Sequence, residues 1–306
     1  MRKVLLATTA LVAMGGVSAA SADITVSGSA SFNYINNSGA GTGPAAAESR
    51  DMSTTTDANI SMSATLDNGM SMSGLVSLDE TGSDDYGWSI TGDFGTVAFG
   101  GTANDGFGAT ATGLTADEGN TMTATSYKTV HNDFIPHSDV SLTLPAVSGF
   151  TIGLGMTDGA TDATDGSQVG VSYAMDAGSM AITVAYASAS TGSNADQSSA
   201  GVTVVAGDTT IVVATNKTTT SSVTHTANSV GASYTVSDSL TVQAYTGTTE
   251  LSNNSAYEVK DTGLGLTYTV TPGLSISVTN NDFTGKGHAS GNENGTRTVV
   301  ALDATF

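Results

Sequence analysis

Residues 60–78 read ISMSATL-DNG-MSMSGLVSL, two alternating runs on either side of a short polar break. Alternation with a period of two is typical of a β-strand whose two faces differ. Asn-Gly between two such runs is a strong hairpin signal. The even-numbered positions are mostly apolar and the odd-numbered ones mostly Ser and Thr, both before and after the break. The stretch therefore predicts a β-hairpin with one apolar face and one hydroxyl-rich face.

The same pattern recurs along almost the whole chain. Tight breaks separate further pairs of runs at 92–95, 145–149, 176–178, 207–208, 237–239 and 271–273. Longer polar gaps lie between the pairs, at about 36–56, 79–86, 101–138, 157–167, 188–199, 217–227, 248–257 and 281–296. Barrels of bacterial outer membranes have an even number of strands, short periplasmic turns and long external loops. We therefore expect an all-β chain folded as a transmembrane antiparallel up-and-down β-barrel of about 16 strands.

The last residues of the sequence favour a closed sheet. Apolar residues at 300, 302, 304 and 306 alternate with Asp303 and Thr305. In hydrocarbon, each orphan backbone group of an unpaired strand edge costs several kcal/mol. We expect the strand at 24–34 to pair with this last strand, which places Phe306 on the lipid-facing side.

Aromatic residues gather near the ends of the predicted strands, as in the two aromatic belts of membrane barrels. The belt on the loop side would contain Tyr34, Tyr86, Trp88, Tyr186, Tyr245 and Tyr257. The belt on the turn side would contain Phe150, Tyr234, Tyr268 and Phe306.

The first residues have the layout of a secretory signal peptide. Arg2 and Lys3 precede an apolar run from Val4 to Val17, and Ala20-Ser21-Ala22 forms a small-x-small cleavage site. The run is shorter than the ~20 residues that a membrane-spanning helix needs. We expect residues 1–22 to be a cleaved signal peptide and residues 23–306 to form a single barrel domain.

The composition excludes several classes of protein. The chain has 28 acidic and 8 basic residues, a formal net charge of −20. Binding to nucleic-acid phosphates needs a basic surface, so no nucleic-acid partner is expected. The chain has no cysteine, which excludes disulfides and thiol chemistry.

Signals for an enzyme or a cofactor are weak. The chain has neither an H-E-x-x-H motif nor a G-x-S-x-G motif. Asp261-Thr262-Gly263 matches the aspartic-protease triplet, but that chemistry needs a second facing carboxylate, so we interpret it as a chance match. Asp158, Asp162 and Asp165 offer oxygen ligands for a structural Ca²⁺, although a solvated acidic loop explains them better. We expect a protein that is not an enzyme and has no cofactor.

The gap at about 101–138 differs from the others in length. Loops much longer than ~15 residues are usually functional or disordered. A segment of this size can fold into a sixteen-stranded lumen and narrow it, and carboxylates there favour cations. The alternative is an external loop that covers the mouth of the barrel. The candidate constriction residues are Asp105, Asp117, Glu118, Asp133 and the basic Lys128.

These features together resemble Gram-negative porins, and most closely the general-diffusion porins of alphaproteobacteria. The resemblance rests on the signal sequence, the hairpin GDFGTVAFG at 92–100 and the final Phe306. It implies a homotrimer of sixteen-stranded barrels in the outer membrane bilayer that lets small hydrophilic solutes diffuse passively. It also implies that the third external loop, here 101–138, forms an eyelet inside the pore. The last strand with Phe306 would be the signal read by the outer-membrane assembly machinery.

One departure from the family concerns charge. Typical members carry a basic cluster on the wall that faces the acidic loop, whereas the basic residues here are few and scattered. The candidate lumen wall is mostly hydroxyl-bearing, and its members are Arg50, Ser61, Ser63, Ser71 and Ser73. We therefore predict a weakly to moderately cation-selective pore. Two alternatives stay open: a barrel plugged by its loops that acts as an anchor or adhesin, and a secreted acidic β-sandwich that binds carbohydrate.

Overall fold

The chain folds into one closed antiparallel sheet. The computed structural model describes residues 22–40, 49–79, 85–100, 139–158, 165–191, 195–220, 222–288 and 291–306. These residues form the strands β1 (Ala22–Ala40), β2 (Ser49–Thr65), β3 (Ser71–Asp79), β4 (Asp85–Gly92), β5 (Gly95–Gly100), β6 (Val140–Thr143), β7 (Phe150–Thr157), β8 (Gly166–Ala177), β9 (Met180–Thr191), β10 (Ala195–Ala206), β11 (Thr209–Thr220), β12 (Val223–Ser237), β13 (Leu240–Leu251), β14 (Asn254–Thr271), β15 (Leu274–His288) and β16 (Gly291–Thr305). None of the described residues belongs to a helix long and apolar enough to cross a membrane.

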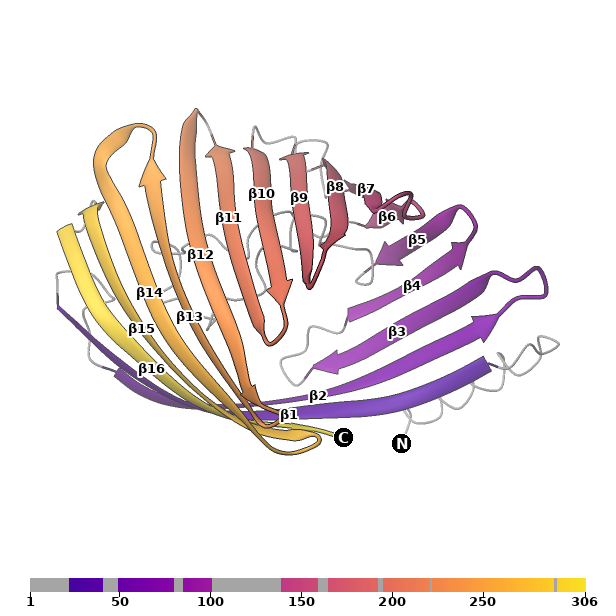
Figure 1. The fold of residues 1–306 in the computed structure, drawn as a ribbon, viewed down its shortest axis with the longest axis horizontal. Coiled ribbons are helices and arrows are strands. Elements are labelled where there is room, and N and C mark those ends of the chain that lie inside the picture. The colour runs from indigo at the N-terminus through magenta and orange to yellow at the C-terminus, as the bar shows by residue number, and fades with distance from the viewer. Residues whose placement is uncertain are drawn as a thin grey trace.

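Every strand pairs with its neighbours in the sequence, and β1 also pairs with β16 (Figure 1). This up-and-down order confirms the predicted sixteen-stranded barrel. It also shows that the β-sandwich alternative is wrong, because a sandwich has two packed sheets and this chain forms one closed sheet. The closing seam continues to the last residue, since the Gly28 and Phe306 backbones bond reciprocally at N···O distances of 2.7 and 3.0 Å.

The hairpin at 60–78 forms as its sequence predicts. Gly69 has φ +82°, a left-handed conformation that glycine adopts without steric cost. The Leu66 N–H donates to the Met70 carbonyl at 2.7 Å, and the Asn68 side chain accepts from the Met70 N–H at 3.1 Å. The strands β2 and β3 then stay in register without a bulge. The turn chemistry and the alternation thus specify the same pairing.

Five of the expected long gaps are instead mostly strand. The ends of β1, β2 and β9 to β16 occupy most of the gaps predicted at 36–56, 188–199, 217–227, 248–257 and 281–296. The segment at 217–227 is rich in Thr, which favours the extended backbone even where both faces meet water. The connection at Ser252 is tied to β12 as well, because its N–H donates to the Thr224 carbonyl and its hydroxyl accepts from the Thr224 N–H, both at 2.9 Å. The prediction of these gaps from polar composition alone therefore ended the strands too early.

The two faces of the sheet differ in character. Large apolar side chains lie exposed on the outer face, for example Val26 (70% exposed) and Leu264 (63% exposed). An apolar band around a closed sheet is what a lipid-facing barrel presents. Toward the loop ends, the outward positions of β14 to β16 change from apolar to polar at Thr262, Asn280 and Thr298. These residues mark the loop-side boundary of the apolar band.

Most of the predicted belt residues point outward. Trp88 stacks on Phe99 with ring centroids 4.3 Å apart, and Phe150 packs on Tyr173 at 4.4 Å. Tyr245 is an exception, because its register with Gly231 and Gly263 puts it on the inner face, where it is 6% exposed. Its assignment to the outer belt was therefore wrong. The side chain of Tyr257 lies outside the described part of the chain.

Candidate functional site: the inner wall of the barrel

The inner wall of β1 to β4 bears the hydroxyl groups that the alternation predicts. Ser61, Ser63, Ser71 and Ser73 all lie at inward positions. The Ser73 and Ser89 hydroxyls hydrogen-bond across neighbouring strands at 2.7 Å. Ser61, Ser63 and Ser73 also line a hollow of about 290 Å³ whose other lining residues are Asp23, Thr25, Met62, Gly74 and Leu75. This part of the wall offers hydroxyl and carboxylate groups to a hydrated solute, beside the apolar side chain of Leu75.

Arg50 does not belong to this wall. Arg50 on β2 pairs with Asn36 on β1. Two positions further along the same strands, Met52 pairs with Tyr34, and both of these point outward. Arg50 therefore lies on the outward face as well. The prediction that Arg50 lines the lumen is wrong, because successive residues of a strand alternate between the faces and Ser61 and Ser63 have the opposite parity. Its guanidinium lies on the outer surface at the loop end of β2.

Carboxylates on the inner face are held by hydroxyls of β1. The Ser29 hydroxyl donates to Asp57 at 3.2 Å, and the Ser31 hydroxyl donates to Asp303 at 2.7 Å. Asp57 and Asp303 thus flank β1 from its two neighbours, β2 and β16. The two carboxylates therefore face the lumen at positions that these hydrogen bonds fix.

The inner face of the described strands carries mostly acidic residues, whereas the outer face carries both signs. The inward acidic residues with described side chains are Asp23, Asp51, Asp57, Asp176, Asp261 and Asp303. Among the basic residues of the described strands, Arg297 alone lies inward, opposite Asn37 and Asn281. Arg50, Lys217, Lys260 and Lys286 all lie on the outer face, near the loop ends. The part of the wall that the structure describes is therefore strongly biased toward negative charge.

A buried polar cluster lies on the inner wall of β13 to β15. The Tyr245 hydroxyl donates to Asp261 at 2.9 Å, and Asp261 is 7% exposed. Gly263 leaves room for both Tyr245 and Asn281, since a Cβ on it would lie 2.5 Å from Asn281 Oδ1 and closer still to Tyr245 Cε1. Asn281 is 1% exposed and makes no side-chain hydrogen bond. The cluster is therefore a buried polar site with unused hydrogen-bonding capacity.

Sequence reasoning missed this cluster. It interpreted Asp261-Thr262-Gly263 only as a chance protease triplet, and assigned Tyr245 to the outer belt. The available signal was the alternation of Val259, Asp261, Gly263 and Gly265, which puts a carboxylate and two glycines on the inner face of a single strand. In this cluster the Asp261 carboxylate accepts from the Tyr245 hydroxyl, which is not the second carboxylate that aspartic-protease chemistry needs.

The candidate constriction residues cannot be placed. Asp105, Asp117, Glu118, Lys128 and Asp133 lie outside the described residues, as do residues 1–21 of the predicted signal peptide.

The candidate Ca²⁺ ligands are only partly described. Asp158 and Asp165 are exposed at the ends of β7 and β8, and Asp162 lies outside the described residues. The Asp158 N–H donates to the Asp139 carboxylate at 2.6 Å. Within the described ranges, no group of three or more His, Cys, Asp or Glu residues is placed to hold a metal ion.

Comparisons with known proteins agree with this geometry. Residues 7–288 match a family model described as Gram-negative porin. The comparison with curated protein sequences found no match.

Solved structures share the fold at low sequence identity. An anion-selective porin from Comamonas acidovorans is 14% identical with a TM-score of 0.66, over 93% of this chain and 100% of that one. OmpT, an outer membrane protein of Vibrio cholerae, is 14% identical with a TM-score of 0.67, over 95% and 99%, and has also been solved in a trimer form. The outer membrane channel DcaP of Acinetobacter baumannii is 12% identical with a TM-score of 0.64, over 94% and 99%.

Proposed function

Because this chain belongs to the Gram-negative porin family, we propose that it forms a water-filled channel in the bacterial outer membrane. Small hydrophilic solutes and ions would cross it by passive diffusion, without enzymatic chemistry. The closed sheet, the apolar outer band and the hydroxyl-lined inner wall support this function.

The channel would prefer cations to anions. The excess of carboxylates on the inner face carries this proposal, because six Asp residues of the described strands face the lumen and Arg297 is the one Lys or Arg residue of these strands that does so. Fixed negative charge on a pore wall raises the local concentration of cations and lowers that of anions. The shared fold with an anion-selective porin decides nothing here, since that protein is 14% identical and the wall residues set selectivity.

The reversal potential in a planar bilayer tests this preference. The purified protein would separate KCl solutions of unequal concentration, and the sign of the zero-current potential reports which ion permeates better. We expect the sign of a cation-selective channel. An anion-selective sign would refute the preference and leave the channel function intact, whereas absence of any conductance would refute the channel function itself.

The plugged-barrel alternative has one observation in its favour. Inner-wall residues such as Ala187 (0% exposed) and Asn281 (1% exposed) are buried although they face the lumen. We propose that residues 101–138 fold into the lumen and constrict it, which would cover such a wall and still leave a pathway. Single-channel recording separates the two functions, because a plugged barrel conducts no steady current.

Two further features extend the proposal. We expect the protein to be a homotrimer, as the family resemblance implies, and native mass measurement in mild detergent would test this. We expect Phe306 to serve the outer-membrane assembly machinery as part of its recognition signal. Heat-modifiable migration on a gel distinguishes an assembled barrel from an unfolded chain.

A further inference from the structure

The inner wall of the barrel is unevenly exposed to water. On β1 to β4, every inward side chain that the structure describes is at least partly accessible, and we call the inner face of these strands the accessible wall. On each strand from β5 to β16, by contrast, the structure describes at least one buried inward residue. On β9 to β12 the buried inward side chains are those of Ala185, Ala187, Ala189, Ser199, Val212, Ala214, Asn216 and Ala227.

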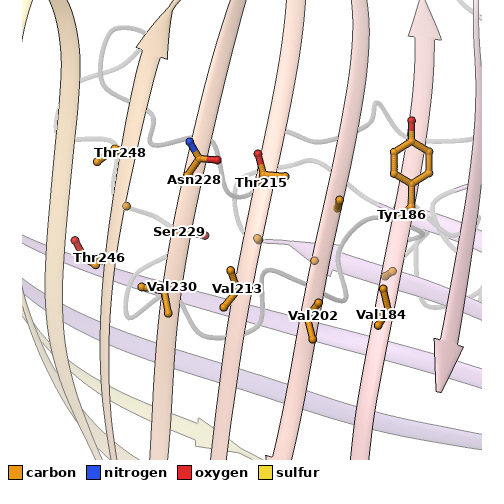
Figure 2. Close-up of a pocket in the computed structure, with 15 residues that line it drawn as sticks. Val184, Tyr186, Val202, Val213, Thr215, Asn228, Ser229, Val230, Thr246 and Thr248 are labelled. Atoms are coloured by element: carbon orange, nitrogen blue, oxygen red, sulfur yellow. The ribbon is translucent and has the colours of Figure 1, made fainter. Parts of the chain in front are cut away.

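The burial on β9 to β12 is confined to the inner face. The outward valines of the same strands lie in one row in Figure 2 and are between 37% and 51% exposed; they are Val184, Val202, Val213 and Val230. Close packing of the strands alone would bury both faces alike. The inward side chains on this side are therefore withdrawn from the water of the lumen.

Four accessible carboxylates follow β1 from its turn end to its loop end, in the order Asp23, Asp57, Asp303 and Asp51. Their levels along β1 are those of residues 23, 29, 31 and 35. At the rise of a β-strand, these levels are about 20, 7 and 14 Å apart. Asp57 and Asp303 thus form the closest pair, and the Ser29 and Ser31 hydroxyls hold them in place.

Positive charge is scarce along this wall. Arg50 is the one Lys or Arg residue of β1 to β4, and it faces outward. Arg297 of β16 lies inward opposite Asn37, one inward step nearer the loops than Asp51, and is half-buried. The accessible wall is therefore negative along most of its length.

We propose that permeating cations pass along the accessible wall rather than along the wall of β9 to β15, and that Asp57 and Asp303 set the ion preference. This inference rests on the channel function proposed above. A solute contacts only those side chains that water reaches, so the buried inward residues do not meet it.

The positions of the two carboxylates explain why this pair acts most strongly. A cation that passes over Ser29 and Ser31 lies between Asp57 and Asp303, because these belong to the two strands next to β1. Neighbouring strands are about 4.8 Å apart. Both carboxylates therefore act on the cation within one Debye length, which is about 10 Å at 0.1 M ionic strength.

Single cysteines test where the pathway lies. The chain has no cysteine, so an introduced thiol is the one that reacts. Ser61→Cys places a thiol on the accessible wall, and Ser199→Cys places one on the inner face of β10, where Ser199 is 2% exposed. A cationic methanethiosulfonate reagent is applied to the conducting channel in a planar bilayer. Ser61→Cys should lose unit conductance and cation preference, whereas Ser199→Cys should keep both.

Heat-modifiable migration and the unit conductance before treatment show that each variant is assembled. A Ser61→Cys channel that the reagent leaves unchanged would overturn the proposal. So would a Ser199→Cys channel that the reagent blocks equally well. A protein that conducts no current before treatment would instead refute the channel function on which the inference rests.

A pair of charge variants tests the assigned residues. Asp57→Asn should lower the ratio of cation to anion permeability by about twofold, which corresponds to the free energy of one exposed charge interaction. Asp261→Asn should leave the ratio unchanged, because the Asp261 carboxylate is inward but buried and accepts from Tyr245. An equal effect of both variants would mean that inward orientation, and not accessibility, decides the preference. That result, or an unchanged ratio in Asp57→Asn, would overturn the assignment.

Discussion

The ring of Phe306 lies directly over Gly28, where a side chain of any other residue would stand. A Cβ on Gly28 would lie 2.5 Å from Phe306 Cε2 and 2.9 Å from its Cζ. The same two residues exchange both backbone hydrogen bonds across the closing seam. Glycine in a strand often marks a site where another group approaches closely. Here the absent side chain allows the last aromatic ring to cover the seam between β1 and the end of the chain.

Gly28→Ala should therefore weaken barrel closure. The added methyl group must displace the Phe306 ring, and the assembled fraction on a heat-modifiable gel should fall. Gly74→Ala is the control, because its Cβ would meet the flexible end of Met62 at 3.3 Å. If both variants assemble equally well, the contact between Gly28 and Phe306 has no role in closure.

Phe306→Asp should impair assembly more than conduction. The substitution places a charged side chain on the lipid-facing surface at the seam. Transfer of this charge into lipid costs free energy and so destabilises the assembled barrel. The barrels that do form should conduct like the wild type, since Phe306 faces away from the lumen. Counting inserted channels and measuring their unit conductance separates the two effects. A changed unit conductance with normal insertion would contradict this expectation.

Asp303→Asn should lower the cation preference. The carboxylate faces the lumen beside Ser31, and its loss removes one fixed negative charge. We expect the ratio of cation to anion permeability to fall by about twofold. A change of this size corresponds to the free energy of one exposed charge interaction. Asp196→Asn is the control, because Asp196 lies on the outer face of β10. An equal effect of both variants would mean that the faces do not decide selectivity.

Salt should weaken the preference of the wild-type channel. Exposed charges are screened over about 10 Å at 0.1 M ionic strength but over about 3 Å at 1 M. The permeability ratio measured at a fixed gradient should therefore move toward that of free diffusion as the mean KCl concentration rises. A ratio independent of salt would point to steric rather than electrostatic selection.

Tyr245→Phe should destabilise the barrel without changing its surface. Removal of the Tyr245 hydroxyl deprives the buried Asp261 carboxylate of the 2.9 Å hydrogen bond that it accepts from this group. A buried polar group that loses a partner costs about 1–3 kcal/mol. Urea unfolding in detergent or lipid measures this loss. Tyr234→Phe on the outer face, where the side chain is 49% exposed, should have little effect.

The fold was predictable from the sequence because its signals are local. The alternation and the Asn-Gly turn at 60–78 specify one hairpin, and repetition of that unit specifies the barrel. The inward placement of Ser61 and Ser63 follows from the same alternation. Arg50 was misplaced because it fell within the gap predicted at 36–56 and so had no parity assigned, whereas it lies at an outward position of β2.

The sites were less predictable because they join residues from different strands. Tyr245 and Asp261 are 16 positions apart, and they meet because Gly263, on the strand of Asp261 and opposite Tyr245, leaves the space open. Four outward valines in register likewise come one from each of β9 to β12, so no local window contains them; they are Val184, Val202, Val213 and Val230. Cross-strand register, which depends on all the turns together, determines these neighbours.

The strands β11 to β14 stay hydrogen-bonded beyond the apolar band, and the connection at Ser252 is fastened to Thr224. This side of the barrel consequently presents a stiff rim to the surroundings of the cell. An external protease needs a segment that can be drawn out of the sheet, and this rim offers little such chain. An antibody or phage that binds this rim would have to contact a surface formed by several strands in their folded arrangement. A linear peptide with the sequence of one strand would therefore bind it poorly.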